Sequence, residues 1–223
     1  MKQIPLAITP AVEARFDTLL AGPNAEVVQH VRTLMPPSAP VYLWGPTGSG
    51  KTHLLAALAE RFQVAGERVG WFGPAEPLPW ALEVGWALVV VDECDLLDAQ
   101  QQQAAFALFV EAGSHGVQWA AAGRVPPVDL PLRDDLRTRL GWGHVFGLRA
   151  LGEDETRAVL RRESDRRGFL LPDEVMDYML TRQQRDLKHL MTLLDRLDGY
   201  AMREKRVVTV PLLRQMLAEE SQA

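Results

Sequence analysis

The feature that most constrains this chain is one complete phosphate-binding loop pattern. The pattern is Gly45-Pro46-Thr47-Gly48-Ser49-Gly50-Lys51-Thr52, and it directly follows the apolar segment 41–44. Glycines at these positions let the backbone wrap around phosphate, so that amide N–H groups and the amino end of the next helix point at the anion. Between a strand and a helix, the pattern predicts that Lys51 neutralises the β- and γ-phosphates and that the Thr52 hydroxyl binds Mg²⁺. A glycine turn that binds nothing is the less favoured alternative.

Apolar segments of strand length alternate with helical segments on both sides of this loop. The expected strands are 41–44, 69–72, 87–91, 117–122 and 144–148. The expected helices are one that Asn24 caps and Pro36-Pro37 ends, then 51–65, 100–112 and a short one near 132–140. This alternation predicts an α/β fold with a parallel five-stranded sheet flanked by helices. We interpret the glutamine run 100–103 as the solvated first turn of its helix.

Beyond residue 148 the strand pattern stops. Segments 153–168, 172–181, 184–203 and 210–219 read as helices, with Gly168 and Gly199 as expected helix ends. We therefore expect an extended tail over 1–10, a nucleotide-binding α/β domain over 11–150 and a small all-helical domain over 151–223.

A second motif is the apolar strand that ends in Asp92 and Glu93, forty residues after Thr52. Asp92 is predicted to lie beside the Mg²⁺, and Glu93 is the natural base for polarising an attacking water. An apolar strand that ends in two acids is weak evidence alone, because many buried strands end in solvated acids. Downstream of a phosphate-binding loop it indicates a nucleotide site.

The third element is a short helix that carries Arg139 and ends at Gly141-Trp142-Gly143. Such a helix can hold an arginine rigidly at the edge of the domain, where its planar guanidinium suits the γ-phosphate of a neighbouring molecule. The alternative is a surface ion pair with Asp134 or Asp135. The residues alone favour neither interpretation.

Charge and cysteine content exclude several classes of protein. The formal net charge is −5, and residues 149–223 hold equal numbers of acidic and basic side chains, so the acidic excess lies in 1–148. A dedicated nucleic-acid binder would normally be basic. The single cysteine, Cys94, is expected to be a packed apolar residue and indicates a reducing compartment. Apolar runs such as 86–91 are far shorter than the roughly 20 residues of a membrane span.

Taken together, the loop, the Asp92-Glu93 strand, Arg139 before Leu-Gly-Trp-Gly and the helical lid resemble the AAA+ module of DnaA-homologous proteins. The match is strongest to the regulatory-inactivator (Hda) family, whose members lack the DNA-binding domain. Further matching stretches are 53–55, 126–127, 167–172 and 190–198. The 14-residue interval 73–86 is too short for the initiator's single-strand-binding insert, and no helix-turn-helix domain is expected after the lid.

The resemblance implies a regulator of replication initiation. Such a protein holds ADP or ATP with Mg²⁺ in the loop, near Asp92 and the lid residue Lys188, while Arg139 promotes hydrolysis of ATP bound to DnaA. The tail residues Gln3, Leu6 and Ile8 resemble the motif that docks on the β sliding clamp of DNA polymerase III, so DNA is reached only indirectly. The implied setting is the bacterial cytoplasm near the nucleoid, with no membrane contact, and the resemblance leaves homo-oligomerisation open.

Two positions depart from the family pattern. The stretch after the fourth expected strand, 120–124, is Ala-Ala-Ala-Gly-Arg, where a small polar or acidic residue is usual, and only Arg124 could orient a water. Lys188 stands where the family has an arginine and lacks its bidentate fork. Both changes indicate an intrinsic ATPase that is weak at most. The lid arginines 157, 161, 162, 166 and 167 lie among acids and are interpreted mainly as a solvated, ion-paired helix face.

Two alternatives remain from other classes. Glu93 favours an autonomous ATPase or helicase-loader-like AAA+ protein. A DNA-binding adaptor related to DnaA is the other, and the acidic net charge opposes it.

Overall fold

The computed structural model describes residues 15–182 and 187–220, and within these ranges the side chains of Arg182, Lys188 and Glu220 fall outside the description. The chain divides into two compact units, Met1–Ala150 and Leu151–Ala223.

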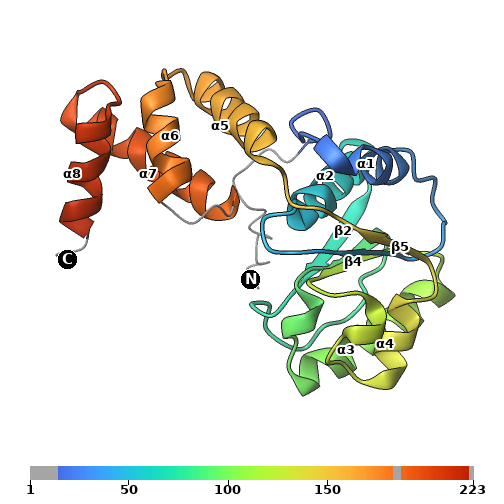
Figure 1. Ribbon diagram of the computed structural model, residues 1–223. Coiled ribbons are helices and arrows are strands. Elements are labelled where there is room, and N and C mark those ends of the chain that lie inside the picture. Colours follow the sequence, from blue (N-terminus) through green and yellow to red (C-terminus); the bar gives the residue numbers. More distant parts are fainter. Residues whose placement is uncertain (1–14, 183–186, 221–223) are drawn as a thin grey trace, which may run out of the picture. The chain divides into compact units, whose positions relative to one another are not determined.

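A five-stranded parallel sheet with the order β2-β3-β4-β1-β5 forms the centre of the first unit (Figure 1). The strands are β1 (Val41–Trp44), β2 (Arg68–Phe72), β3 (Trp86–Val91), β4 (Gln118–Gly123) and β5 (His144–Gly147). The predicted parallel five-stranded sheet is therefore confirmed, with each strand boundary within one residue of its expected place.

Helices cover both faces of this sheet (Figure 1). They are α1 (Ala25–Arg32), α2 (Lys51–Val64), α3 (Ala99–Ser114) and α4 (Asp134–Leu140). Short 3₁₀ turns lie at Gly22–Asn24, Cys94–Leu96 and Pro127–Asp129. Side chains of β3 alternate between two cores: Leu88 and Val90 pack with α1 and α2, whereas Val89 and Val91 pack with α3. Burial on both faces explains why the strands read as continuous apolar runs.

Strand register brings the ends of three strands to one edge of the sheet. Trp44 of β1 is in register with Gly123 of β4, and Val91 of β3 pairs with Ala121. The residues that follow these strands therefore meet at the carboxyl edge, where open α/β sheets bind their ligands.

Two local expectations in the first unit are wrong. Asn24 lies at the N-cap of α1, but its side chain makes no capping hydrogen bond. It bonds instead to the backbone of Arg149, which is far away in sequence. Gln101 is buried rather than solvated: it completes a capping box with Asp98 and donates to the Pro74 carbonyl. In both cases a tertiary partner determines what the side chain does.

The second unit is helical throughout its described residues. Its helices are α5 (Glu153–Arg167), α6 (Asp173–Arg182), α7 (Leu187–Glu204) and α8 (Val210–Glu220). Gly168 ends α5 with a left-handed φ of 78°, as expected. Gly199 instead lies inside α7 and ends no helix. Buried side chains on both sides of Gly199, Leu197 and Tyr200 among them, continue the apolar stripe of α7 through this position. Their packing outweighs the roughly 1 kcal/mol that a helical glycine costs.

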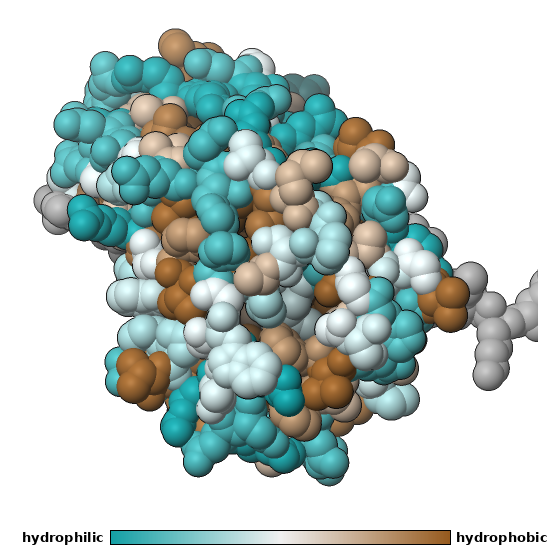
Figure 2. Space-filling model, turned by 90° about the vertical axis from the view of Figure 1, so that its right-hand side faces the viewer, coloured by the Kyte–Doolittle hydropathy of each residue, from teal (hydrophilic) through white to brown (hydrophobic). Residues whose placement is uncertain are grey.

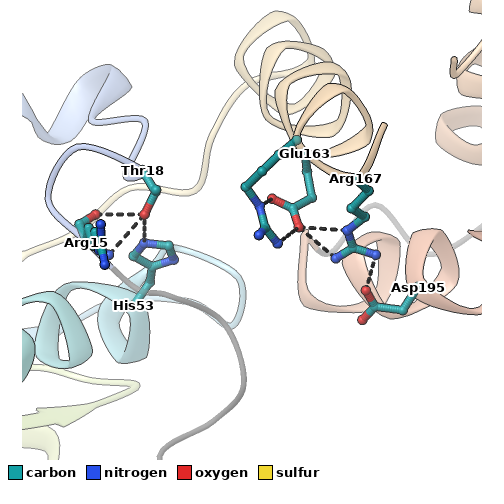
Figure 3. Close-up of polar contacts among 7 residues, drawn as sticks. Arg15, Thr18, His53, Glu163, Arg167 and Asp195 are labelled. Carbon is teal, nitrogen blue, oxygen red and sulfur yellow. Dashed lines mark hydrogen bonds and ion pairs between the residues drawn. The ribbon is translucent and has the colours of Figure 1, made fainter. Parts of the chain in front are cut away.

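Ion pairs of the lid arginines join its helices as well as lining α5. Arg167, whose side chain is only 15% exposed, contacts Glu163 within α5 and Asp195 of α7 (Figure 3). Arg157 pairs with Glu153 and with Asp177 of α6. Ion pairing was expected for this face, but several of the partners belong to neighbouring helices. These ion pairs therefore connect the helices of the lid to one another, in addition to forming a charged surface on α5.

Exposed apolar residues are scattered over the surface. On the face shown in Figure 2, hydrophobic residues lie in small groups among hydrophilic ones. The exposed large apolar residues include Met35, Val84, Val128, Trp142, Leu170 and Val207. None of the described helices combines the length and apolar character needed to cross a bilayer.

Candidate nucleotide-binding site and arginine helix

The loop between β1 and α2 has a backbone that its glycines permit. Gly48 and Gly50 have φ values of 77° and 92°, in the left-handed region that glycine adopts without strain, and Gly50 is the N-cap of α2. Gly45 has no room for a side chain, because a Cβ there would lie 2.3 Å from the Leu148 carbonyl oxygen. The loop is thereby held against the segment that follows β5, with the amino end of α2 at its base.

Lys51 lies across this loop. Its Nζ donates to the carbonyl oxygens of Gly45 and Pro46, at 2.8 and 2.9 Å. Burial lowers the pKa of Lys51, and the nearby carboxylates, Asp92 foremost, act in the opposite direction. The ammonium is thus placed at the loop where a phosphate would be held.

The two motifs meet at Thr52 and Asp92. The Asp92 carboxylate accepts a hydrogen bond of 2.9 Å from the backbone N–H of Glu93 and lies close to the Thr52 hydroxyl. Asp92 is only 7% exposed, and burial raises its pKa, while the Thr52 hydroxyl and the Glu93 N–H act to lower it. Hydroxyl and carboxylate oxygens are the ligands that Mg²⁺ prefers. The pair therefore provides the oxygen donors that the sequence predicted.

Glu93 is exposed beside this pair. Its backbone has φ 49° and ψ 39°, a left-handed conformation that is uncommon for a residue other than glycine. Such conformations cluster at functional sites. The turn directs the chain from the buried end of β3 into the 3₁₀ segment that begins at Cys94, which is buried as expected.

Ser49 supplies an independent indication that the loop is built for a ligand. Its Oγ is buried and has no hydrogen-bond partner among the described residues. A buried hydroxyl without a partner costs free energy unless something pairs with it. An unpaired hydroxyl, a lysine and left-handed glycines in one loop fit a nucleotide phosphate, and Thr52 with Asp92 fits its Mg²⁺.

The segment before α1 packs beside the start of α2. The Thr18 hydroxyl donates to the Arg15 carbonyl and lies 3.5 Å from Nε2 of His53, two residues after Lys51 (Figure 3). Arg15 pairs with Glu60 further along α2, at 2.8 Å. These contacts hold the segment that leads into α1 against α2, the helix that follows the phosphate-binding loop.

Arg124, at the end of β4, is held by a carboxylate that sequence reasoning missed. Its guanidinium and its backbone N–H both donate to Asp95, three residues beyond Asp92. The preceding Gly123 is needed for packing, since a Cβ there would lie 2.4 Å from the Tyr42 hydroxyl. The two partners are 29 residues apart, and no local pattern links them. Arg124 is thus engaged in an ion pair beside the candidate site.

The arginines at α4 differ in their partners. Arg137 pairs with Asp134 at 2.6 Å and Arg133 with Asp135 at 2.8 Å. Arg139 pairs with no carboxylate in the described part of the chain. Its guanidinium carbon lies instead over three rings, 4.7 Å from the centroid of Trp142, 5.2 Å from Phe106 and 5.7 Å from Phe109. The ion-pair interpretation therefore applies to Arg137 and does not hold for Arg139.

Four predicted site residues lie outside what the structure describes. Gln3, Leu6 and Ile8 belong to residues 1–14, and the side chain of Lys188 is likewise not described.

One comparison with known proteins concerns the helical unit, and the others span most of the chain. Residues 153–217 match the family model described as "Hda, lid domain". Domain III of the replication initiation protein DnaA from Thermotoga maritima superposes with a TM-score of 0.77 at 18% identity, over 95% of this chain and 98% of that one. A DnaA bound to AMPPCP and single-stranded DNA gives 0.63 at 18% identity, covering 89% and 70%. The Thermotoga maritima RuvB branch-migration motor gives 0.59 at 16%, covering 86% and 64%.

The parallel sheet, the phosphate-binding loop and the helical second unit give this chain the fold of DnaA domain III and of the RuvB motor. Over residues 153–217 the helical unit is similar to the lid domain of Hda proteins.

Proposed function

We propose that this protein is a nucleotide-bound regulator of replication initiation that promotes hydrolysis of ATP bound to DnaA. The observation that carries the proposal is the state of Arg139, a permanent cation with no carboxylate partner among the described residues, in an Hda-like chain. On the same helix, Arg137 is instead engaged by Asp134 at 2.6 Å.

The nucleotide in this proposal is ADP or ATP with Mg²⁺. The loop glycines, Ser49 and Lys51 would hold its phosphates, and Thr52 with Asp92 would hold the metal ion. Bound Mg²⁺ neutralises phosphate charge. The AMPPCP in the related DnaA structure supports an adenine nucleotide. The role of the bound nucleotide in this protein is to stabilise the fold, because a ligand that binds only the native state raises the stability of that state.

Arg139 acts on a second molecule. A guanidinium brought to the γ-phosphate of ATP on DnaA would offset the negative charge that develops on the transferred group. An arginine supplied in trans contributes on the order of 10³–10⁵ in rate. One residue can therefore account for most of such a regulator's effect.

The amino-terminal tail brings the protein to DNA in this scheme. Leu6 and Ile8 would enter an apolar pocket on the β sliding clamp, and Gln3 would form hydrogen bonds at its rim. The net charge of −5 supports indirect access to DNA, since binding through phosphate contacts would favour a basic surface.

The deciding experiment measures hydrolysis of ATP pre-bound to DnaA, with and without clamp loaded on DNA. We expect stimulation that requires both this protein and the loaded clamp. Arg139→Ala abolishes it, whereas Arg137→Ala, the matched control on the same helix, leaves most of it. Gln3→Ala combined with Leu6→Ala removes the dependence on the clamp. Normal stimulation by the Arg139 variant would show that the assigned mechanism is wrong.

An autonomous ATPase is the second candidate, and the contact between Thr52 and Asp92 beside the exposed Glu93 favours it. The ion pair that engages Arg124 counts against it, because this end of β4 then offers no unengaged side chain to a water. Fast ATP turnover by the protein alone, stimulated by DNA and lost in Glu93→Gln, would support this candidate over the regulator.

A further inference from the structure

One face of α3 makes the contacts that locate Arg139. Gln102, Phe106 and Phe109 follow one another at spacings of four and three residues, so they lie on the same side of the helix. Phe106 and Phe109 both lie under the Arg139 guanidinium. Trp142, from the turn after α4, approaches it at 4.7 Å. Three aromatic rings from two elements thus surround one cation.

Gln102 fixes the other end of the arginine helix. Its Oε1 accepts the backbone N–H of Arg133, just before α4, at 3.0 Å. Its Nε2 donates at 2.8 Å to the carbonyl of Leu97, in the segment that follows Asp92 and Glu93. α4 is therefore attached to α3 at its amino end by a hydrogen bond and near its carboxyl end by ring contacts.

A contact with aromatic rings holds a guanidinium differently from an ion pair. The rings attract the cation but offer no carboxylate oxygen, so the five N–H donors are not occupied by a strong acceptor. A carboxylate partner would occupy those donors and neutralise the charge. An aromatic enclosure orients the side chain while leaving both its charge and its fork for a phosphate.

The exposure of Trp142 points the same way. Its side chain is 64% exposed and still contacts Arg139, so this large ring contributes little to the core of the unit. Phe106 is half-buried at the same place. Burial in the core therefore does not explain why a large aromatic ring stands at position 142, whereas its contact with the Arg139 guanidinium does.

We propose that Trp142 and Phe106 are positioning residues that hold the Arg139 guanidinium ready for the phosphate of a neighbouring nucleotide. The proposal rests on the proposed function, since it concerns how the same arginine is presented. The guanidinium carbon of Arg139 lies 4.7 Å from the Trp142 ring centroid and 5.2 Å from that of Phe106, and the hydrogen bond from Arg133 to Gln102 attaches α4 to α3.

The test is the rate of hydrolysis of DnaA-bound ATP across a titration of this protein in full-length form. Trp142→Leu and Phe106→Leu remove the rings, while Trp142→Phe and Phe106→Tyr keep an aromatic face. We expect each Leu variant to lower the rate at saturation by about threefold to thirtyfold, the range of one cation–π contact, with the half-saturating concentration nearly unchanged. The aromatic variants should restore most of the rate. Val110→Ala, at an exposed position of α3, serves as the control.

Further outcomes separate this proposal from the function on which it rests. Suppose that Arg139→Ala is inactive but that both Leu variants reach the wild-type rate at saturation. That result would overturn the positioning role alone. Equal losses in the Leu and aromatic variants would also overturn it, because shape and not the ring face would then matter. An active Arg139→Ala would overturn the proposed function itself. Trp142 is mostly exposed, so its variants remain informative even if Phe106→Leu fails to fold.

Discussion

The side chain of Asn24 forms two hydrogen bonds with the backbone of Arg149, donating to its carbonyl at 2.9 Å and accepting from its N–H at 2.8 Å. Arg149 follows Leu148, whose carbonyl lies where a Cβ on Gly45 would fall. The amide of Asn24 thus holds the segment against which the nucleotide loop is packed. A residue before the first helix thereby influences the shape of the candidate site.

Asn24→Ala is expected to destabilise the α/β unit. The change removes both hydrogen bonds to the Arg149 backbone, and each such bond contributes about 0.5–1.5 kcal/mol net. Urea unfolding followed by circular dichroism would measure the loss. Gln29→Ala, at an exposed position on α1, is the control and should stay within about 0.5 kcal/mol of the wild type. Equal effects of the two variants would show that the bonds to Arg149 contribute nothing.

Arg61 is expected to matter more than other surface arginines. Its guanidinium donates from α2 to the carbonyls of Val31, Arg32 and Leu34, at the end of α1, and burial lowers its pKa. Arg61→Gln should cost about 1–3 kcal/mol, because several carbonyl oxygens lose a charged donor. Arg68→Gln removes an exposed ion pair with Glu83 and one exposed hydrogen bond to the Val84 carbonyl, and it should cost at most about 1 kcal/mol. Chemical denaturation of both variants decides whether this ranking is right.

The sequence was sufficient for what depends on local pattern. Strand–helix alternation predicted the parallel sheet, and this prediction succeeds because the spacing of apolar residues indicates which segments are buried. The sequence also predicted that Asp92, at the end of its strand, lies near the Mg²⁺ of the phosphate-binding loop, and that part stays a prediction.

Local sequence patterns could not predict contacts between residues that are far apart in the chain. Asn24 was expected to cap its helix and instead bonds to Arg149, and Asp95 holds Arg124 across 29 residues. The aromatic surroundings of Arg139 depend on the packing of α3 against α4. Spacing within α3 places Phe106 and Phe109 on one side of that helix, but no pattern in the sequence says which arginine they meet.

His30 should make stability depend on pH in the mildly acidic range. Burial lowers its pKa, and the adjacent His144 lowers it further; the two ring centroids are 4.5 Å apart. The unfolded chain then binds a proton below about pH 6.5 more readily than the folded chain, so stability falls as the pH drops through this window. Free energies of unfolding measured in this range should fall less steeply for His30→Gln than for the wild type. His115→Gln, at an exposed site, is the control, and an unchanged slope in His30→Gln would contradict the assignment.

Gly45→Ala should separate nucleotide binding from folding. The new Cβ would lie 2.3 Å from the Leu148 carbonyl oxygen, so the loop must move from the geometry in which its N–H groups can surround phosphate. For the wild type, ADP with Mg²⁺ at about 100 times its Kd should add about 2.7 kcal/mol of stability and raise the Tm. For Gly45→Ala this ligand-induced rise should be absent.

Gly66→Ala is the matched control for that variant. Gly66 also has a positive φ, of 85°, but nothing lies within 4 Å of an added Cβ, and the residue follows the far end of α2. Backbone strain should therefore lower the Tm of Gly66→Ala by itself, while its response to ADP and Mg²⁺ should match that of the wild type. A full ligand-induced shift in Gly45→Ala would mean that the loop can bind nucleotide without its packing against Leu148.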